Sequence, residues 1–461
     1  MVVIADSTAT PRLAGPVPPP GPLPALTAIR RARDNFIAIY PEQAYQETVV
    51  AQRFLWFRSW IVSDPAGIRH VLLDNAGNYH KSELGRRILE PGLGRGLLTS
   101  EGETWRAHRR IMAPAFDHRS ILGYAPIISG AAEALLEDWH GQPADSEVEI
   151  ATAMSRLTLA IIARTMFASE SEAIVDIIER DFATYQADIQ PNLLDYVGGP
   201  GWLAGWRRVR RARRAHRAFD AVIARLVADR TKAGPDAPKD LLARLIAARD
   251  EETGGGMSAE EVRDQVVTIF LAGHETTAVA LTWTWYLLAR HPAVEAKLHA
   301  ELDRVLAGRT PGHGDIANLP YTRMVIEEAM RLYPPAPGLS REAIGDDEVC
   351  GQKVPKGSLI FIIPWLVHRH RRLWDDPDRF EPERFAAERA AARSRFAYLP
   401  FGAGPRICIG AAFAMVEAVL LLASLAQRFR LRLVPGWPVE PQALITLRPR
   451  HGIMMRLQPR P

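Results

Sequence analysis

The sequence predicts a mainly α protein with a smaller β part, an α+β fold in a single domain. Helical periodicity dominates from about residue 103 to residue 333, and Pro- and Gly-rich breaks such as VGGPGW and KAGPDAPKD separate the helices. Short apolar runs with turn residues stand on either side of this region, and no linker divides the chain of 461 residues. A chain of this length can bury a substantial core without disulfide bonds.

The elements follow in order along the chain. Residues 1–24 hold a Pro-rich run and are expected to form an extended arm, and residues 25–461 form the domain. The runs QETVVAQRF and LWFRSWIV predict strands. The longest predicted helix lies between Met257 and Pro292, where Ser258 and Glu261 have the spacing of a capping box. The segment EVCGQKVPKGSLIFIIP then predicts short strands, and a final helix is expected after Cys408.

Composition argues against several classes of protein. The net charge is only +4, and no run of Lys and Arg interleaved with aromatic residues indicates a nucleic-acid groove. The N-terminus lacks the features of a signal peptide, and no segment has the roughly 18 uncharged apolar residues of a membrane span. The Arg- and Trp-rich residues 202–219 fit an interfacial helix or a solvated one, and we favour the solvated helix. We therefore expect a soluble, cytoplasmic monomer without a membrane anchor that binds no nucleic acid.

The stretch FAYLPFGAGPRICIG surrounds Cys408 with three glycines, a proline and Arg406. Glycine allows a tight bend and a close approach to a flat ligand. A strongly helical segment follows, so Cys408 stands near a helix N-terminus, where free amide donors are expected to lower its pKa. A thiolate in an apolar turn is a good ligand for iron, although a lone cysteine at a helix start is more often a packed residue. We interpret Cys350 in this second way, as a small apolar strand residue.

Residues 401–410 match the pattern Phe-Gly-x-Gly-x-Arg-x-Cys-x-Gly, which resembles the haem-binding signature of the cytochrome P-450 superfamily, the haem-thiolate monooxygenases. The resemblance covers nearly the whole chain. It implies that haem b, iron protoporphyrin IX, lies between the long central helix and the cysteine-bearing helix, with Cys408 as the iron ligand. The implied reaction inserts one oxygen atom of O2 into a C–H bond of the substrate.

The segment AGHETT in the long helix is similar to the oxygen-activating motif of the family. The resemblance makes Glu275 the acid and Thr276 the alcohol that deliver protons to bound dioxygen. It also suggests that Gly273 leaves room for dioxygen on the helix face. Two alternatives are a peroxygenase driven by peroxide and a non-catalytic haem sensor. Relatives driven by peroxide tend to lose the acid–alcohol pair, which this chain keeps.

Two further motifs of the family have matches here. EEAMRLYPP and PERF resemble the motifs that place Glu328, Arg331 and Arg384 in a buried ion cluster, which shapes the region beneath the haem. GLLTSEGETWRAHRRIMAPAF is similar to the helix along one haem edge.

In that helix Trp105 and Arg109, four residues apart, share a face and are expected to bind one propionate. Arg341 and Arg406 match further propionate-binding positions, whereas His368 is left out of the haem site.

Electrons are expected from a separate ferredoxin or flavodoxin with its own reductase, because no Gly-x-Gly-x-x-Gly follows a strand. Arg106 and Arg110 are expected to point to solvent, either as part of a basic docking patch or as an ordinary solvated face. The resemblance assigns an apolar substrate pocket, and we expect a fatty acid or other lipid first and a terpenoid second. The pocket is expected to be lined by a loop at residues 88–98 and by Ile269, Phe270, Gly273, Leu339 and Ile445.

Overall fold

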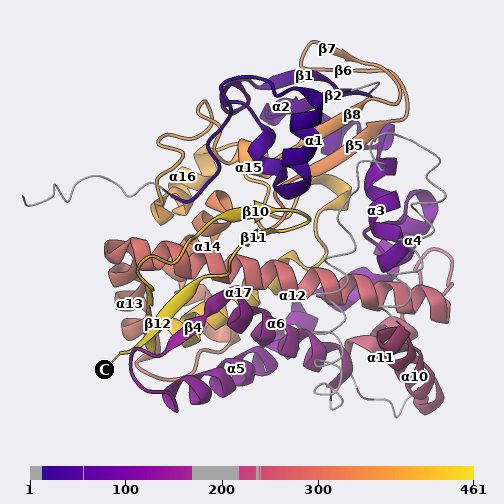
Figure 1. The fold of residues 1–461 in the computed structure, drawn as a ribbon. Helices are drawn as coiled ribbons and strands as arrows, with labels where there is room; N and C mark the ends of the chain where they lie inside the picture. Colours follow the sequence, from indigo (N-terminus) through magenta and orange to yellow (C-terminus); the bar gives the residue numbers. More distant parts are fainter. Residues whose placement is uncertain (1–12, 55–56, 169–216, 235–237, 239, 461) are drawn as a thin grey trace, which may run out of the picture.

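The computed structural model describes residues 13–54, 57–168, 217–234, 238 and 240–460. Helices form most of it, and the largest sheet lies at one side of the helical body (Figure 1). The α+β fold class predicted from the sequence is confirmed. Residues 202–216 of the Arg- and Trp-rich segment lie outside the described residues.

The long helix α12 runs through the middle of the molecule (Figure 1). It covers Ala259–Arg290, and Ser258 and Glu261 form the predicted capping box at its start. The other helices of the first half are α1 (Ala25–Asp34), α2 (Pro65–Arg69), α3 (Glu83–Leu93), α4 (Gly102–Met112), α5 (His118–His140) and α6 (Ile150–Phe167). Those of the second half are α10 (Arg217–Ala233), α11 (Leu241–Ala247), α13 (Pro292–Leu306), α14 (Pro320–Leu332), α15 (Pro364–Val367), α16 (Ala387–Ala392) and α17 (Ala411–Ala426).

Helix α3 corrects one expectation from the sequence. Residues 88–98 were expected to form a pocket loop, but the first part of this stretch is helical. The side chain of Ser82 accepts a hydrogen bond from the Gly85 amide and so caps the helix. The loop proper begins at Gly94.

Strands form one large sheet and three small ones. The five-stranded sheet has the order β1-β2-β8-β5-β3 and consists of β1 (Val49–Phe54), β2 (Phe57–Val62), β8 (Leu359–Ile362), β5 (Leu339–Ala343) and β3 (Tyr79–His80). The antiparallel pairing of β1 with β2 confirms the two strands predicted near the N-terminus. The small sheets are β4 (Glu147–Glu149) with β12 (Met454–Pro459) and β9 (Phe429–Leu433), the hairpin β10 (Pro441–Ala443) with β11 (Leu447–Pro449), and β6 (Asp347–Val349) with β7 (Gln352–Val354).

Cys350 is not a strand residue, so that prediction is wrong. Cys350 and Gly351 connect β6 to β7 with φ angles of 50° and 76°, and the cysteine is exposed. Two successive residues with positive φ are typical of a tight hairpin turn, which follows the right-handed twist of the strands. The prediction assigned Cys350 to a strand, whereas the backbone makes a turn at this residue.

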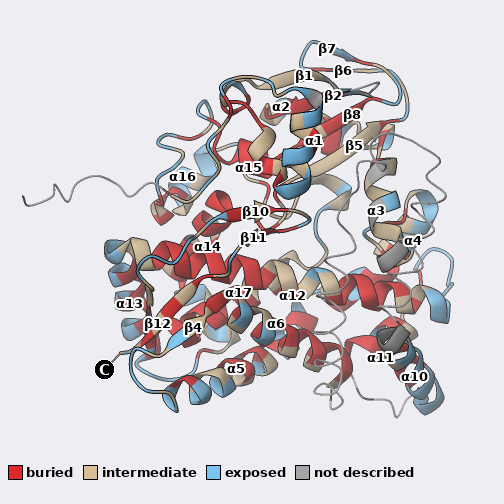
Figure 2. Ribbon diagram, in the orientation of Figure 1, coloured by how far each residue is buried: buried red, intermediate tan, exposed pale blue. Residues whose placement is uncertain are grey.

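Helices α6, α12 and α17 form the interior of the helical body, and much of α12 is buried (Figure 2). Two of these helices, α6 and α12, are long and apolar enough to cross a membrane, but 61% and 72% of their apolar windows are buried inside the protein. Burial of this extent is typical of core helices. The packing brings α17, which follows the cysteine turn, against α12 and α5.

Residues 13–24, the described part of the segment before α1, form no helix or strand but are hydrogen-bonded to the core. The Tyr333 hydroxyl donates to the carbonyl oxygen of Ala14 at 2.8 Å, and the Ala14 amide donates to the Tyr286 hydroxyl at 3.2 Å. The carbonyl oxygen of Pro19 accepts a bond from the Glu42 amide. The described part of the expected arm therefore lies against the domain.

Candidate functional site

The turn before α17 is closed by its own backbone. The amide of Cys408 donates to the carbonyl oxygen of Phe401 at 2.9 Å, and the amide of Ile407 donates to that of Gly404 at 3.1 Å. Gly404 has a φ of 72°, and a Cβ at this position would lie 1.7 Å from the carbonyl oxygen of Leu72. Both the conformation and the close contact require glycine here. The turn thus presents Cys408 on a rigid loop packed against residues 70–74.

Burial raises the pKa of the Cys408 thiol, because the surrounding protein disfavours the thiolate. The backbone amide of Gly410 and the charge of Arg109 act in the opposite direction. Gly410 is the N-cap of α17, which begins at Ala411, so an amide at the helix N-terminus does lower the thiol pKa as expected, but burial outweighs it. A coordinated metal cation deprotonates a thiol outright, and a sulfur in this position fits an iron ligand.

Beside the turn, three cations gather around one carboxylate. Arg406 pairs with Glu101, with 2.9 Å between Nη1 and Oε1, and its guanidinium lies 4.5 Å from the ring centre of Trp105. Lys81 Nζ donates to two backbone carbonyls at 2.8 and 3.0 Å. Arg341 is close enough that its charge lowers the pKa of Lys81.

The negative charge near these three cations is too small to balance them. The pKa of Lys81 falls to about 7, mainly through burial and also through the charges of Arg406 and Arg341, while Glu101 opposes the shift. Burial also lowers the pKa of Arg341 to about 10. With three positive charges and one carboxylate, the cluster requires a further anionic partner. The two propionates of a haem supply such charge, so these residues fit that group. Lys81 was missed in the sequence because it belongs to no recognisable pattern, and Glu101 was missed because, within the matched segment at residues 96–116, only Trp105 and Arg109 were assigned to the haem.

Arg109 lies at the cysteine turn. Its Nη1 donates to the carbonyl oxygen of Ile407 at 2.9 Å, one residue before Cys408. Burial lowers the pKa of Arg109, and Cys408 opposes this shift. Its assignment to a propionate stays a prediction.

Glu328, Arg331 and Arg384 come together inside the protein. Arg331 donates to both carboxylate oxygens of Glu328, at 2.6 and 2.8 Å, and the Nε of Arg384 lies 3.4 Å from Oε1. Arg331 also donates to the carbonyl oxygens of His368, Pro377 and Arg379. His368 is fully buried and accepts a bond from the Leu399 amide, so it belongs to this framework.

The acid and the alcohol on α12 have different partners. Thr276 Oγ1 donates to the carbonyl oxygen of Ala272 at 2.7 Å. The Glu275 carboxylate accepts a hydrogen bond from Thr446 Oγ1 at 2.6 Å. Ala272 is exposed and lies four residues before Thr276, so the two side chains share a face of the helix.

Gly273 does not lie on the face expected for dioxygen. A Cβ on Gly273 would lie 3.4 Å from Cδ1 of Ile162, so this position faces α6, and the sequence prediction is wrong. A helical period identifies residues that share a face, but it does not say which neighbour that face meets. Ala272 is the small residue beside the alcohol.

The remaining pocket residues are spread over different environments. Phe270 is fully buried and stacks on Phe167 with ring centres 6.0 Å apart, which contradicts its prediction as a pocket residue. Ile269 is nearly as buried and belongs to the same core cluster. Leu339 lies beside the cysteine turn, where a Cβ on Gly402 would be 3.8 Å from its Cδ1. Ile445 is 47% exposed at the tip of the β10–β11 hairpin.

The two arginines expected in a basic patch are both paired. Arg110 makes two contacts with Asp250, at 2.8 and 3.1 Å, and a third with Glu252 at 3.3 Å. The side chain of Arg110 stays 30% exposed, but these carboxylates already neutralise its charge. Arg106 is exposed and pairs with Glu103.

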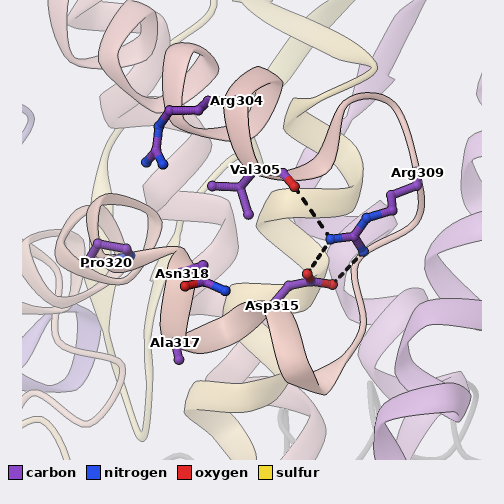
Figure 3. A pocket seen from close by; sticks show the side chains of 7 residues that line it. All are labelled: Arg304, Val305, Arg309, Asp315, Ala317, Asn318 and Pro320. Atoms are coloured by element: carbon purple, nitrogen blue, oxygen red, sulfur yellow. Dashed lines mark hydrogen bonds and ion pairs between the residues drawn. The ribbon is translucent and has the colours of Figure 1, made fainter.

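A hollow of about 450 Å³ lies elsewhere, over the end of α13 and the start of α14 (Figure 3). Arg309 projects into it but is engaged by Asp315, with 2.7 Å between Nη1 and Oδ2, and by the carbonyl oxygen of Val305. The residues that line it are Arg304, Val305, Arg309, Asp315, Ala317, Asn318 and Pro320. None of the residues predicted for the site is among them.

Comparisons with known proteins agree with this geometry. Residues 17–455 match the family model described as Cytochrome P450. The chain is 38% identical to "Cyclooctatin synthase" of Streptomyces melanosporofaciens over 83% of each chain, and 34% identical to "Cyclooctat-9-en-7-ol 5-monooxygenase" of the same organism over 90% of each. It is 33% identical to "Pentalenene oxygenase" of Streptomyces avermitilis over 80% of each chain.

A solved structure has the same architecture. The crystal structure of the cytochrome P450DA heme domain superposes with a TM-score of 0.83 at 26% identity and covers 98% of this chain and 99% of that one. Two of these relatives are named as a monooxygenase and an oxygenase, and the family implies a haem cofactor, dioxygen and a redox partner. The chain belongs to the cytochrome P450 family and is a monooxygenase of the cytochrome P450 type.

Proposed function

We propose that this protein hydroxylates an apolar cyclic terpenoid, with haem b bound through Cys408. The observation that carries the proposal is the cysteine turn, which only glycine at position 404 permits, beside three cations that share one carboxylate. Of the two substrate classes expected from the sequence, the names of the relatives favour the terpenoid over the fatty acid. Those names include cyclooctat-9-en-7-ol and pentalenene.

When bound, the haem supplies the activation of dioxygen. The sulfur of Cys408 would hold the iron, and Lys81, Arg341 and Arg406 would neutralise the propionates. Trp105 supports Arg406 by stacking beneath its guanidinium. The peptide carbonyls that bind Lys81 keep its ammonium at this position.

Thr276 and Glu275 hold and move protons. The Thr276 hydroxyl donates to the helix backbone, so its lone pairs can accept a proton or a water molecule. Glu275 is the adjacent ionisable group on α12 and passes protons inward from the solvent side. This acid–alcohol pair supports a reaction with O2 over the alternative of a peroxide-driven peroxygenase or a haem sensor.

The proposed electron donor is a separate ferredoxin or flavodoxin with its reductase, and the proposed setting is a cytoplasmic monomer. The absence of a dinucleotide fingerprint from the sequence supports the separate donor. Arg106 remains a candidate for the docking face, whereas Arg110 is occupied by Asp250.

The test compares Cys408→Ser with Cys350→Ser in protein purified from haem-replete cells. We expect the carbon monoxide difference spectrum of a thiolate haem in the wild type and in Cys350→Ser, and its loss in Cys408→Ser. Binding spectra with a panel of cyclic terpenoids and fatty acids then identify the substrate class, and labelled O2 in the product confirms the reaction. A normal spectrum in Cys408→Ser contradicts the proposal, and binding of fatty acids alone contradicts the substrate class.

A further inference from the structure

The tip of the β10–β11 hairpin reaches the acid of α12. The hydroxyl of Thr446 donates to Oε1 of Glu275 at 2.6 Å, a contact between residues 171 positions apart in the sequence. Thr446 is only 7% exposed, so the bond is shielded from solvent. The turn itself is closed by the amide of Leu444, which donates to the carbonyl oxygen of Thr446 at 3.2 Å. A hydrogen bond to an ionised carboxylate is among the stronger ones in proteins.

The base of the hairpin is fixed to the core. The side-chain amide of Asn35 donates to the carbonyl oxygen of Pro441 at 2.7 Å, and its oxygen accepts from the amide of Ala443 at 3.0 Å. On the other strand, the indole of Trp283 donates to the carbonyl oxygen of Leu447 at 2.7 Å. These bonds hold both strands of the hairpin.

Trp283 and Glu275 lie on the same helix, eight residues apart. Trp283 is fully buried and stacks on Tyr333 with ring centres 4.1 Å apart, so its position is well fixed. Trp283 of α12 is therefore hydrogen-bonded to the hairpin, and the hairpin is hydrogen-bonded through Thr446 to Glu275 of the same helix. The position of Thr446 relative to Glu275 is set by the helix itself.

We propose that Thr446 is a positioning residue, whose hydroxyl holds the Glu275 carboxylate in one orientation beside Thr276. The proposal rests on the proposed function, in which Glu275 passes protons to the oxygen site. The last torsion of a glutamate side chain is soft, so the carboxylate samples many orientations unless a partner holds it. A carboxylate that points away delivers its proton late, so that two electrons from the proposed donor and two protons from solvent are lost on O2 as hydrogen peroxide.

The first measurement reports on the contact without turnover. Thermal unfolding of the purified protein, whether or not it carries haem, is compared among the wild type, Thr446→Val, Glu275→Ala and the double variant. We expect the double variant to melt no lower than the less stable single variant, because both single changes remove the same bond. Additive shifts contradict the proposed contact.

The second measurement separates positioning from a general structural role. In Thr446→Val we expect product formed per electron consumed to fall at least threefold, with a lower kcat and a KM within twofold of the wild type. Thr446→Ser, which keeps the hydroxyl, restores both values to within twofold. Thr282→Val removes a buried hydroxyl of α12 that binds only the carbonyl oxygen of Ala278 among the contacts described, and it keeps the wild-type ratio.

An unchanged ratio of product to electrons in Thr446→Val contradicts the proposal, and so does a serine variant that behaves like valine. A change in KM with kcat preserved assigns Thr446 to the substrate pocket instead and also contradicts it. The two proposals fail separately. A missing thiolate spectrum contradicts the haem assignment, while the unfolding comparison still reports whether Thr446 and Glu275 interact.

Discussion

Glu328 and Arg331 form a two-pronged ion pair in the interior, with N–O distances of 2.6 and 2.8 Å and no solvent access to either side chain. Glu328→Gln leaves the guanidinium of Arg331 buried without its counter-charge, which costs about 3–5 kcal/mol of unfolding free energy. We expect this loss in urea titrations, together with poor haem incorporation. Arg323→Gln removes the exposed arginine of a pair with the partly buried Glu327 on the same helix, and we expect it to cost about 1 kcal/mol. Equal losses of unfolding free energy in the two variants would show that the interior pair stabilises the protein no more than the pair of Arg323 does.

Gly404→Ala tests the fit of the cysteine turn. The added Cβ meets the carbonyl oxygen of Leu72 and sits at a positive φ, so we expect loss of bound haem and a lower melting temperature. Gly357→Ala is the matched control, because Gly357 has a φ of 75° with nothing within 4 Å. That variant reports the cost of the backbone conformation alone, about 1–2 kcal/mol. If the two alanine variants lower the melting temperature by the same amount, the close contact with Leu72 adds nothing to the cost of the substitution.

Glu417 on α17 should make stability depend on pH. Burial raises the pKa of Glu417 to about 8, against an ordinary value of 4.5, and the Thr277 side chain opposes the shift. Below the ordinary value the carboxyl is protonated in both states. As the pH rises towards 8, the unfolded chain ionises first, so the folded state loses up to about 1.4 kcal/mol per pH unit.

Glu417→Gln keeps the side chain neutral at every pH, so its stability relative to the wild type should grow with pH. Melting curves from about pH 5 to about pH 9 check this expectation, with the exposed Glu137→Gln as the control. A constant difference between Glu417→Gln and the wild type across this range would show that Glu417 ionises normally.

Lys81→Met tests the cationic cluster. Removing one charge-assisted hydrogen bond to a carboxylate costs about 1.5–3 kcal/mol, so haem should dissociate about 10- to 100-fold faster. Transfer of haem to an excess of apomyoglobin measures the rate. Lys297→Met, which removes an exposed lysine paired with Glu383, should leave the rate unchanged. Equal rates for Lys81→Met and the wild type would remove Lys81 from the cofactor site.

The sequence was informative where a motif is local. The spacing of Ser258 and Glu261 predicted the start of α12, and short apolar runs predicted β1 and β2. Its failures at Gly273 and Phe270 have a common cause. A helical period cannot tell whether a face meets an open site or another helix, and here α6 covers that face.

Other parts of the site depend on contacts between distant segments. Lys81 and Glu101 reach Arg406 across some 300 residues, and Thr446 reaches Glu275 across 171. A single lysine or threonine has no signature in the sequence that identifies such a partner. Cys350 shows the converse case, because the strand-like run around it did not reveal that the chain turns at that residue.

The hydrogen bonds at Ala14 bear on how the protein should be produced. Tyr333 and Tyr286 are hydrogen-bonded to the backbone of this residue. Tyr333 also stacks on Trp283, which is hydrogen-bonded to the β10–β11 hairpin near the C-terminus. Trimming or fusing the chain near position 14 would therefore disturb packing at the opposite end of the sequence. An N-terminal affinity tag should therefore be separated from Ala14 by a spacer.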